Sequence, residues 1–155
     1  MSEGTFVVVD MPADAELRRR AAAWVVEEWP HLFPDDTEQW YLDVWAQADV
    51  TGAEAPHAVV ALRDGEVIGT ASMVLDDELP GAHEPGPWIA AVWVHPGHRR
   101  RGVGRAMVRE LMSRARGRLW LYTENEAAWY VSMGWTRVRD ATLNGHTVTV
   151  MTWSA

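Results

Sequence analysis

The interpretation of the whole sequence depends on the stretch from Trp88 to Arg118, WIAAVWVHPGHRRRGVGRAMVRELMSRARGR. Its first part, Trp88 to Val94, is an apolar run rich in β-branched and aromatic side chains, which is typical of a strand. A helical pattern begins near Gly102 and fades around Gly117. Glycines let a backbone approach a ligand closely, and the first N–H groups of a helix have no partner within the helix. The turn between strand and helix therefore predicts an anion site.

Arginines strengthen this prediction. The turn and the first helical residues carry Arg99, Arg100, Arg101 and Arg105. Each charge-assisted bond to a phosphate oxygen contributes about 1.5–3 kcal/mol, so a few of them hold a diphosphate without a metal ion. A Walker loop is excluded because the chain has no lysine, and the dinucleotide fingerprint fails because Met107 stands at its third glycine position.

We expect the 155 residues to form one domain over 1–155. Charge is distributed unevenly along them. The net charge is −8, yet Arg99 to Arg118 holds eight arginines and one acid, Glu110, so this segment carries +7 and the remainder −15. Nucleic-acid binding would predict a basic chain, whereas an acidic body with one basic patch favours a focused anion site and small cationic ligands. We expect Arg109, Arg114 and Arg116 to be solvated.

Missing residue types exclude several chemistries. The chain contains no cysteine, which excludes disulfides, thiolate metal sites and a cysteine acyl-enzyme, and no lysine, which excludes a Schiff base. His95 and His98 flank Pro96-Gly97 rather than sharing a helix and have no third partner, so we expect no metal. No signal peptide and no membrane-spanning run is evident, and we expect a cytoplasmic protein that does not bind membranes.

Periodicity and turn signals place the other elements. We expect strands at Thr5–Val9, His57–Arg63, Glu66–Leu75, Leu119–Thr123, Trp135–Arg139 and Thr147–Trp153, helices at Ala13–Trp29, Thr37–Ala48, Val103–Ala115 and Glu126–Met133, and loops at Gly52–Pro56 and Asp76–Pro87. Asp64-Gly65 and Asn144-Gly145 predict two-residue hairpin turns. Because a strand, helix, strand connection is right-handed, Trp88–Val94 and Leu119–Thr123 should be parallel neighbours.

Two motifs carry a family resemblance. Arg99-x-x-Gly102-x-Gly104 resembles the acyl-coenzyme A loop of the GNAT acetyltransferase superfamily, and Tyr130-x-x-x-Gly134-Trp135 is similar to that family's Tyr-x-x-x-Gly-Phe. The resemblance spans roughly Val59 to Trp153. It implies an α/β fold with a mixed, mostly antiparallel sheet of about six or seven strands, a splayed parallel pair at 88–94 and 119–123, and about four flanking helices.

The resemblance also implies an arrangement for acetyl-CoA. The pantetheine arm would pair with the backbone of the first parallel strand, and the diphosphate would rest on N–H groups of the Arg/Gly loop. The implied cofactor-binding residues are Val92, Trp93, Val94, Arg99, Arg100, Arg101, Gly102, Val103, Gly104, Arg105 and Asn125. In the family an asparagine stands about eight residues before the tyrosine, whereas Asn125 is five before Tyr130.

Acetyl transfer to an amine needs proton transfers at two places. An amine with a pKa near 10.4 is protonated at neutral pH, and freeing its lone pair costs about 4–5 kcal/mol, so a base is expected. The resemblance implies Tyr130 as the general acid for the leaving thiolate. The family's usual glutamate position holds Trp88, which leaves Glu84 as the nearest acid and candidate base, with His83, Glu78 or a water route as alternatives.

We therefore expect an acyl-CoA-dependent N-acetyltransferase without a metal. It would act on a primary amine of a small molecule (a cationic amine, an antibiotic or an amino-acid derivative) by direct attack in a ternary complex, as a monomer or homodimer. The alternatives are a silent acyl-CoA sensor and a peptide or protein N-acetyltransferase; we expect no nucleic-acid partner. Trp40, Tyr41, Val44 and Trp45 either fill the core or line an acceptor pocket rimmed by His31, Asp35 and Asp36.

Overall fold

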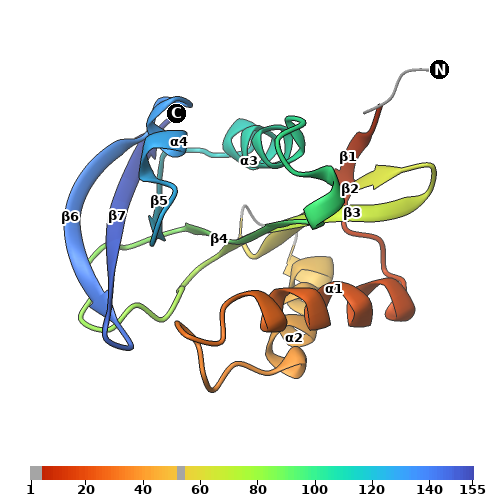
Figure 1. Cartoon of the computed structure of the whole chain (residues 1–155), viewed down its shortest axis with the longest axis horizontal. Helices are drawn as coiled ribbons and strands as arrows, with labels where there is room; N and C mark the ends of the chain where they lie inside the picture. Colours follow the sequence, from red (N-terminus) through yellow and green to blue (C-terminus); the bar gives the residue numbers. More distant parts are fainter. Residues whose placement is uncertain (1–4, 52–54) are drawn as a thin grey trace.

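The computed structural model describes residues 5–51 and 55–155 and, within them, a seven-stranded sheet of order β1-β2-β3-β4-β5-β7-β6. The strands are β1 (Val7–Asp10), β2 (His57–Arg63), β3 (Glu66–Val74), β4 (Trp88–Val94), β5 (Arg118–Thr123), β6 (Thr136–Leu143) and β7 (His146–Ser154). The helices are α1 (Ala15–Glu28), α2 (Glu38–Thr51), α3 (Val103–Ser113) and α4 (Ala127–Val131), with a 3₁₀ turn η1 (Pro96–His98). β4 and β5 are parallel and the other neighbours antiparallel, so the expected mixed sheet is confirmed (Figure 1).

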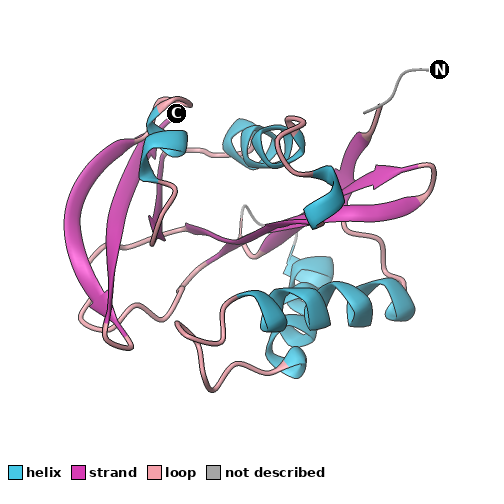
Figure 2. Cartoon of the chain, viewed as in Figure 1, coloured by secondary structure: helices cyan, strands magenta, loops and turns pink. Residues whose placement is uncertain are grey.

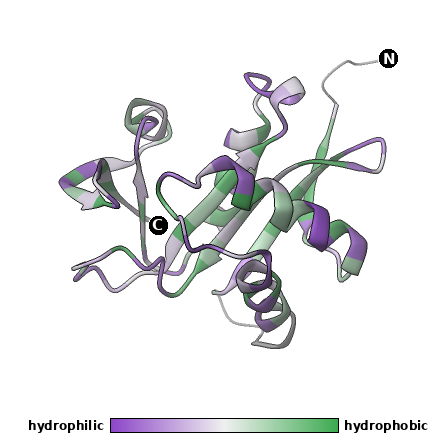
Figure 3. Ribbon diagram, turned by 60° about the horizontal axis from the view of Figure 1, so that its bottom comes forward, coloured by the Kyte–Doolittle hydropathy of each residue, from purple (hydrophilic) through white to green (hydrophobic). Residues whose placement is uncertain are grey.

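Helices cover both faces of the β1–β4 part of the sheet. Figure 2 shows α3 on one face and α1 with α2 on the other. In β2, Val59 and Ala61 pack in the cluster that contains α3, whereas Ala58 and Val60 pack with α1 and α2. A strand covered on both sides needs apolar residues at every position, which explains the continuous apolar run of β2. Figure 3 shows the same contrast, with hydrophobic strands inside and hydrophilic stretches on loops and outer helix turns.

The two hairpins form as their turn residues predict. Asp64 and Gly65 have φ angles of 52° and 80°, and Asn144 and Gly145 have 47° and 78°. Two consecutive positive φ angles are the signature of a type I′ turn, which matches the twist of the flanking strands. These turns fix β2 against β3 and β6 against β7.

Element ends differ from the sequence prediction where capping decides them. α1 begins at Ala15 rather than Ala13 because the side chain of Asp14 accepts a hydrogen bond from Leu17 N at 3.1 Å. α4 ends at Val131. The loop predicted at Gly52–Pro56 falls largely outside the described residues. In the described part of the chain no helix is long and apolar enough to cross a membrane.

Candidate active site

The parallel strands β4 and β5 meet at one end and then separate. The register between them joins Trp88 to Trp120, and Trp120 N donates to Pro87 O at 3.0 Å. After Trp88, the edge of β4 that faces β5 pairs with no strand among the described residues. The predicted splayed pair is therefore present, and it leaves backbone N–H and C=O groups of β4 facing a gap.

A bulge bends β4 at this gap. Between its pairings with Thr70 and Ser72 of β3, β4 has two residues, Ala91 and Val92, where β3 has one. Ala91 adopts φ 55°, a left-handed conformation that costs a non-glycine residue about 1–2 kcal/mol. Backbone strain of this kind persists where the surrounding structure enforces it, often at functional sites.

The loop after β4 leads directly into the first turn of α3. Arg100 and Gly102 have φ angles of 64° and 84°, and Gly102 caps the helix without a side-chain hydrogen bond, so the first N–H groups of α3 have no side-chain partner there. A side chain at Gly104 would meet Trp129 at 3.3 Å. Glycine at this position lets Trp129 and Val94 pack closely against the first turn of α3.

Two arginines are fixed in this loop region by neighbouring groups. Arg99 Nε donates to Val94 O at 2.8 Å, and its guanidinium pairs with Glu28 at the end of α1. Arg105 donates to Ser132 Oγ at 2.8 Å. Hydrogen bonds that hold the side chains in place reduce the entropy lost when an anion binds.

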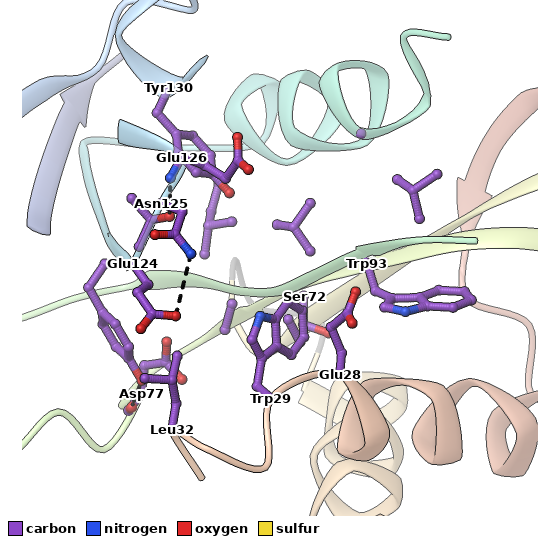
Figure 4. A pocket seen from close by; sticks show the side chains of 18 of the residues that line it. Glu28, Trp29, Leu32, Ser72, Asp77, Trp93, Glu124, Asn125, Glu126 and Tyr130 are labelled. Carbon is purple, nitrogen blue, oxygen red and sulfur yellow. Dashed lines mark hydrogen bonds between the residues drawn. The ribbon is translucent and has the colours of Figure 1, made fainter. Parts of the chain in front are cut away.

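A cavity of about 850 Å³ opens between the strands, the Arg/Gly loop and the segment joining α1 to α2. Figure 4 labels Glu124, Asn125 and Tyr130 among the residues that line it, together with Trp29, Leu32 and Asp77. Its carboxylates are Glu28, Asp36, Asp77, Glu78, Glu124 and Glu126, and its aromatic walls include Trp29, Phe33, Trp40, Tyr41, Tyr122 and Trp129. The same cavity is lined by Arg99, Arg100 and Arg105. It therefore has a cationic region and an acidic, aromatic region.

Phenols and acids are packed closely in the acidic region. Tyr41 donates to Asp36 Oδ2 at 2.6 Å, and Tyr122 donates to the backbone oxygen of Asp77 at 2.9 Å. Burial raises the pKa of Asp77 well above its usual range, and the charges of Asp36 and Glu78 add to this shift. Burial also raises the pKa of Asp36, although its bond from Tyr41 opposes the shift. A cationic group would relieve this concentration of negative charge.

Tyr130 lies in the cavity wall on α4 with 7% of its surface exposed. Its ring packs edge-on to Trp129 and Trp135, with centroids at 4.8 and 6.0 Å. Among the described residues its hydroxyl has no hydrogen-bond partner. Burial, with the charge of Glu126 as a smaller cause, raises the pKa of Tyr130, so the phenol keeps its proton across the neutral range.

Comparison with known proteins identifies this arrangement. Residues 15–135 match the acetyltransferase (GNAT) family. The chain belongs to the GNAT acetyltransferase family. The motifs at Arg99–Gly104 and Tyr130–Trp135 indicate the same family from the sequence alone.

Curated relatives match part of the chain. A mycothiol acetyltransferase of Thermomonospora curvata is 41% identical over 86 residues, which are 53% of this chain and 27% of that protein. Another, of Saccharopolyspora erythraea, is 42% identical over 69 residues, which are 44% of this chain and 21% of that protein. The match thus spans about a quarter of the length of these relatives.

Solved structures share the GNAT fold across the whole chain. An aminoglycoside 6′-N-acetyltransferase complexed with coenzyme A has a TM-score of 0.73 at 13% identity, covering 96% of both chains. A ribosomal-protein-alanine N-acetyltransferase of Brucella melitensis has 0.72 at 18% identity, covering 96% of this chain and 99% of the other. A Salmonella typhimurium protein solved with its cofactor acetyl-CoA has 0.68 at 17% identity, covering 97% and 94%.

The structure brings most of the predicted cofactor residues together around the cavity. Those that line it are Val92, Trp93, Val94, Arg99, Arg100, Gly102, Val103, Gly104, Arg105 and Asn125. Arg101 is exposed and does not line the cavity. Arg109, Arg114 and Arg116 are exposed, as expected, and Arg114 also pairs with Asp10 at 2.6 Å. In the described residues no group of three or more His, Asp or Glu side chains is arranged to hold a metal ion.

Glu84, the candidate base of the sequence prediction, has a different environment. Arg139 of β6 donates two hydrogen bonds to its carboxylate, at 3.0 and 2.7 Å, and this pair lowers the pKa of Glu84. Glu84 does not line the cavity, whereas Glu78, one of the alternatives, does. The geometry favours the carboxylates inside the cavity as bases, and the Glu84 assignment stays a prediction without support from the geometry.

Sequence reasoning did not single out three polar residues of this site. Asp77 lies in the loop predicted at Asp76–Pro87 and Glu124 follows β5, so only the fold shows that both line one cavity. Ser72 lines the cavity from β3 and accepts a hydrogen bond from Trp45 at 3.0 Å. The aromatic residues of α2 divide between both expected roles: Trp45 is buried in the core, while Trp40 and Tyr41 line the cavity.

Proposed function

We propose that this GNAT enzyme transfers an acetyl group from acetyl-CoA to a primary amine of a small cationic molecule. The observation that carries the proposal is a single cavity with opposite charge in its two regions. The arginines of the loop suit the phosphates of the cosubstrate, and the carboxylates around Asp36 and Asp77 suit an acceptor with positive charge. Aromatic walls such as Trp40 add cation–π attraction.

Residues around the gap suit a thioester that carries an extended arm and a diphosphate. Backbone groups from Val92 to Val94 can pair with the amides of the arm as a missing strand would. The N–H groups from Arg100 to Arg105, with Arg99 and Arg105 as cations, can hold the diphosphate. Asn125 lines the cavity beside the gap and can donate to the arm.

Within this proposal the acceptor attacks the thioester directly. Acetyl-CoA supplies an activated carbonyl, and the chain has no cysteine to take the acetyl group first. Tyr130 donates its proton to the departing sulfur, because its hydroxyl is protonated, faces the cavity and has no other partner among the described residues. A carboxylate of the acidic region takes the proton from the acceptor ammonium.

An acceptor panel with acetyl-CoA tests the proposal, with thiol release and product mass as readouts. The panel contains polyamines, amino-acid amides, aminoglycosides and peptides with N-terminal alanine. The last two classes are included because two fold relatives are named as an aminoglycoside 6′-N-acetyltransferase and a ribosomal-protein-alanine N-acetyltransferase. We expect turnover with small cationic amines. Asp36→Asn and Asp77→Asn should raise KM for a dicationic amine more than for a monocationic one, whereas Asp43→Asn, an exposed acid on α2, should not.

Two outcomes would contradict the proposal. Tight acetyl-CoA binding without turnover on any amine would favour the sensor module. Turnover restricted to peptides would favour a peptide N-acetyltransferase.

A further inference from the structure

Glu124, which follows the end of β5, is the central residue of a cluster with two histidines. His31 Nε2 lies 2.8 Å from Glu124 Oε1, and His146 Nδ1 lies 3.2 Å from Glu124 Oε2. The two imidazole rings meet edge to face with centroids 5.1 Å apart. Each carboxylate oxygen thus has its own imidazole, from a different segment of the chain.

The cluster is built into the fold by further contacts. His31 lies in the segment between α1 and α2, and its backbone oxygen accepts a hydrogen bond from Asn144 Nδ2 at 2.7 Å. Asn144 belongs to the type I′ turn that precedes His146. The β6–β7 turn, the α1–α2 segment and the end of β5 are therefore joined at Glu124.

The three side chains lead from the cavity to water. Glu124 lines the cavity with 23% of its side chain exposed, whereas His31 and His146 do not line it and are 41% and 42% exposed. Figure 4 shows Glu124 projecting into the cavity beside Asn125, whose amide lies 3.5 Å from Oε1. Imidazole is the side chain that exchanges protons most readily near neutral pH.

We propose that Glu124 takes the proton from the acceptor ammonium and that His31 and His146 pass it to solvent. This inference rests on the proposed amine acetylation and names its base. Glu124 would be a catalytic residue, because it touches the acceptor. The two histidines act through it and are positioning and relay residues.

The protons and bonds of this step balance. The ammonium gives one proton to Glu124, which passes it through an imidazole to water. The freed lone pair forms the N–C bond to the thioester carbon and the C–S bond breaks. Tyr130 protonates the departing sulfur and is reprotonated by the second proton that the nitrogen loses. The products are the amide, the free thiol of coenzyme A and one proton in solution.

Other titratable groups line the same cavity and define the rival. They are Glu28, Asp36, Tyr41, Asp77, Glu78, His98, Tyr122, Glu126 and Tyr130. Asp77 is the strongest rival because it is a carboxylate in the acidic region, but among the described residues no imidazole contacts it. Glu124 differs from Asp77 in having two imidazoles within contact distance of its carboxylate.

The first experiment compares acceptors of different basicity. Spermidine must lose a proton before it attacks, whereas hydroxylamine is largely unprotonated at neutral pH. Glu124→Gln should lower kcat/KM for spermidine about 10²-fold or more, and that for hydroxylamine less than about tenfold. Asp43→Asn is the matched control. In both variants the acetyl-CoA affinity and the melting temperature should equal those of the wild type.

The second experiment tests the relay. The double variant His31→Gln, His146→Gln should lose about tenfold in kcat/KM for spermidine and recover as imidazole buffer is added, which a purely structural role would not produce. If the wild type acetylates neither amine, the proposed function fails. If it does and Glu124→Gln affects both amines equally, or Asp77→Asn alone gives the acceptor-dependent loss, the inference about Glu124 is wrong.

Discussion

Replacing Tyr130 with phenylalanine separates chemistry from stability. The change removes a hydroxyl that has no hydrogen-bond partner among the described residues and leaves the ring against Trp129 and Trp135. We therefore expect the free energy of unfolding to change by less than about 0.5 kcal/mol, because no bond or packing contact is lost. Tyr130→Ala also removes a ring that is 7% exposed and should cost about 3–5 kcal/mol.

The rate should respond very differently from the stability. Positioned proton transfer is typically worth a factor of about 10²–10⁴, so Tyr130→Phe should lower kcat by this factor, which corresponds to about 3–5 kcal/mol in the barrier. Because its pKa is raised, Tyr130 should cause no alkaline fall in the wild-type rate up to about pH 10.

The assay is thiol release at saturating acetyl-CoA over a range of pH, with calorimetric binding of coenzyme A and thermal unfolding measured in parallel. A Tyr130→Phe enzyme with unchanged kcat at every pH would refute the general-acid role. A loss of coenzyme A affinity equal to the loss in rate would show instead that the hydroxyl binds the cosubstrate.

Three further changes test other parts of the structure. Burial raises the pKa of Asp77, so its ionised form destabilises the fold. The free energy of unfolding is therefore highest below the ordinary carboxyl range and falls as pH rises through the folded-state pKa. Asp77→Asn should raise the melting temperature at about pH 8 and not at about pH 3. Ala91→Val should be about 1–2 kcal/mol less stable than Ala91→Gly in denaturant unfolding, because only glycine accepts φ 55° without strain; equal stabilities would contradict this. The pair with Arg139 lowers the pKa of Glu84, so its stabilisation is present above the ordinary carboxyl range and is lost as pH falls through the folded-state pKa. Glu84→Gln should cost about 1 kcal/mol at neutral pH with kcat retained, and a large fall in kcat would restore Glu84 as the base.

Local signals in the sequence predicted the sheet and the position of the Arg/Gly loop between β4 and α3. β4 has the predicted bounds, and both I′ turns formed because Asp64-Gly65 and Asn144-Gly145 determine their own backbone conformation. The arginines and glycines from Arg99 to Gly104 are contiguous, so their joint position required no knowledge of the tertiary fold.

The acidic region and the bulge were not predictable in this way. Asp36 was expected at the rim of an acceptor pocket as one of two alternatives, and it lines the cavity. Asp77 and Glu124 join it there only through long-range packing, and each alone resembles an ordinary surface acid. The bulge at Ala91 has no glycine, the residue that often marks a bulge in a sequence. The pairing of β3 with β4 enforces the conformation of Ala91, which alanine does not itself prefer. The pairing of Glu84 with Arg139 was likewise not predictable from local sequence, since the two residues are 55 positions apart.

The single pairing of Trp88 with Trp120 divides the sheet into two hydrogen-bonded units, β1–β4 and β5–β7. Amide hydrogen exchange should register this division, because each unit can open without breaking the other's ladder. An extended ligand bonded to β4 within the gap would protect the edge amides of that strand. Any contacts it also made to the β5 side would raise the free energy of opening for both units together. A ligand bound in the gap would thus couple the opening of the two units. Slower hydrogen exchange at amides far from the reacting carbonyl would measure this coupling.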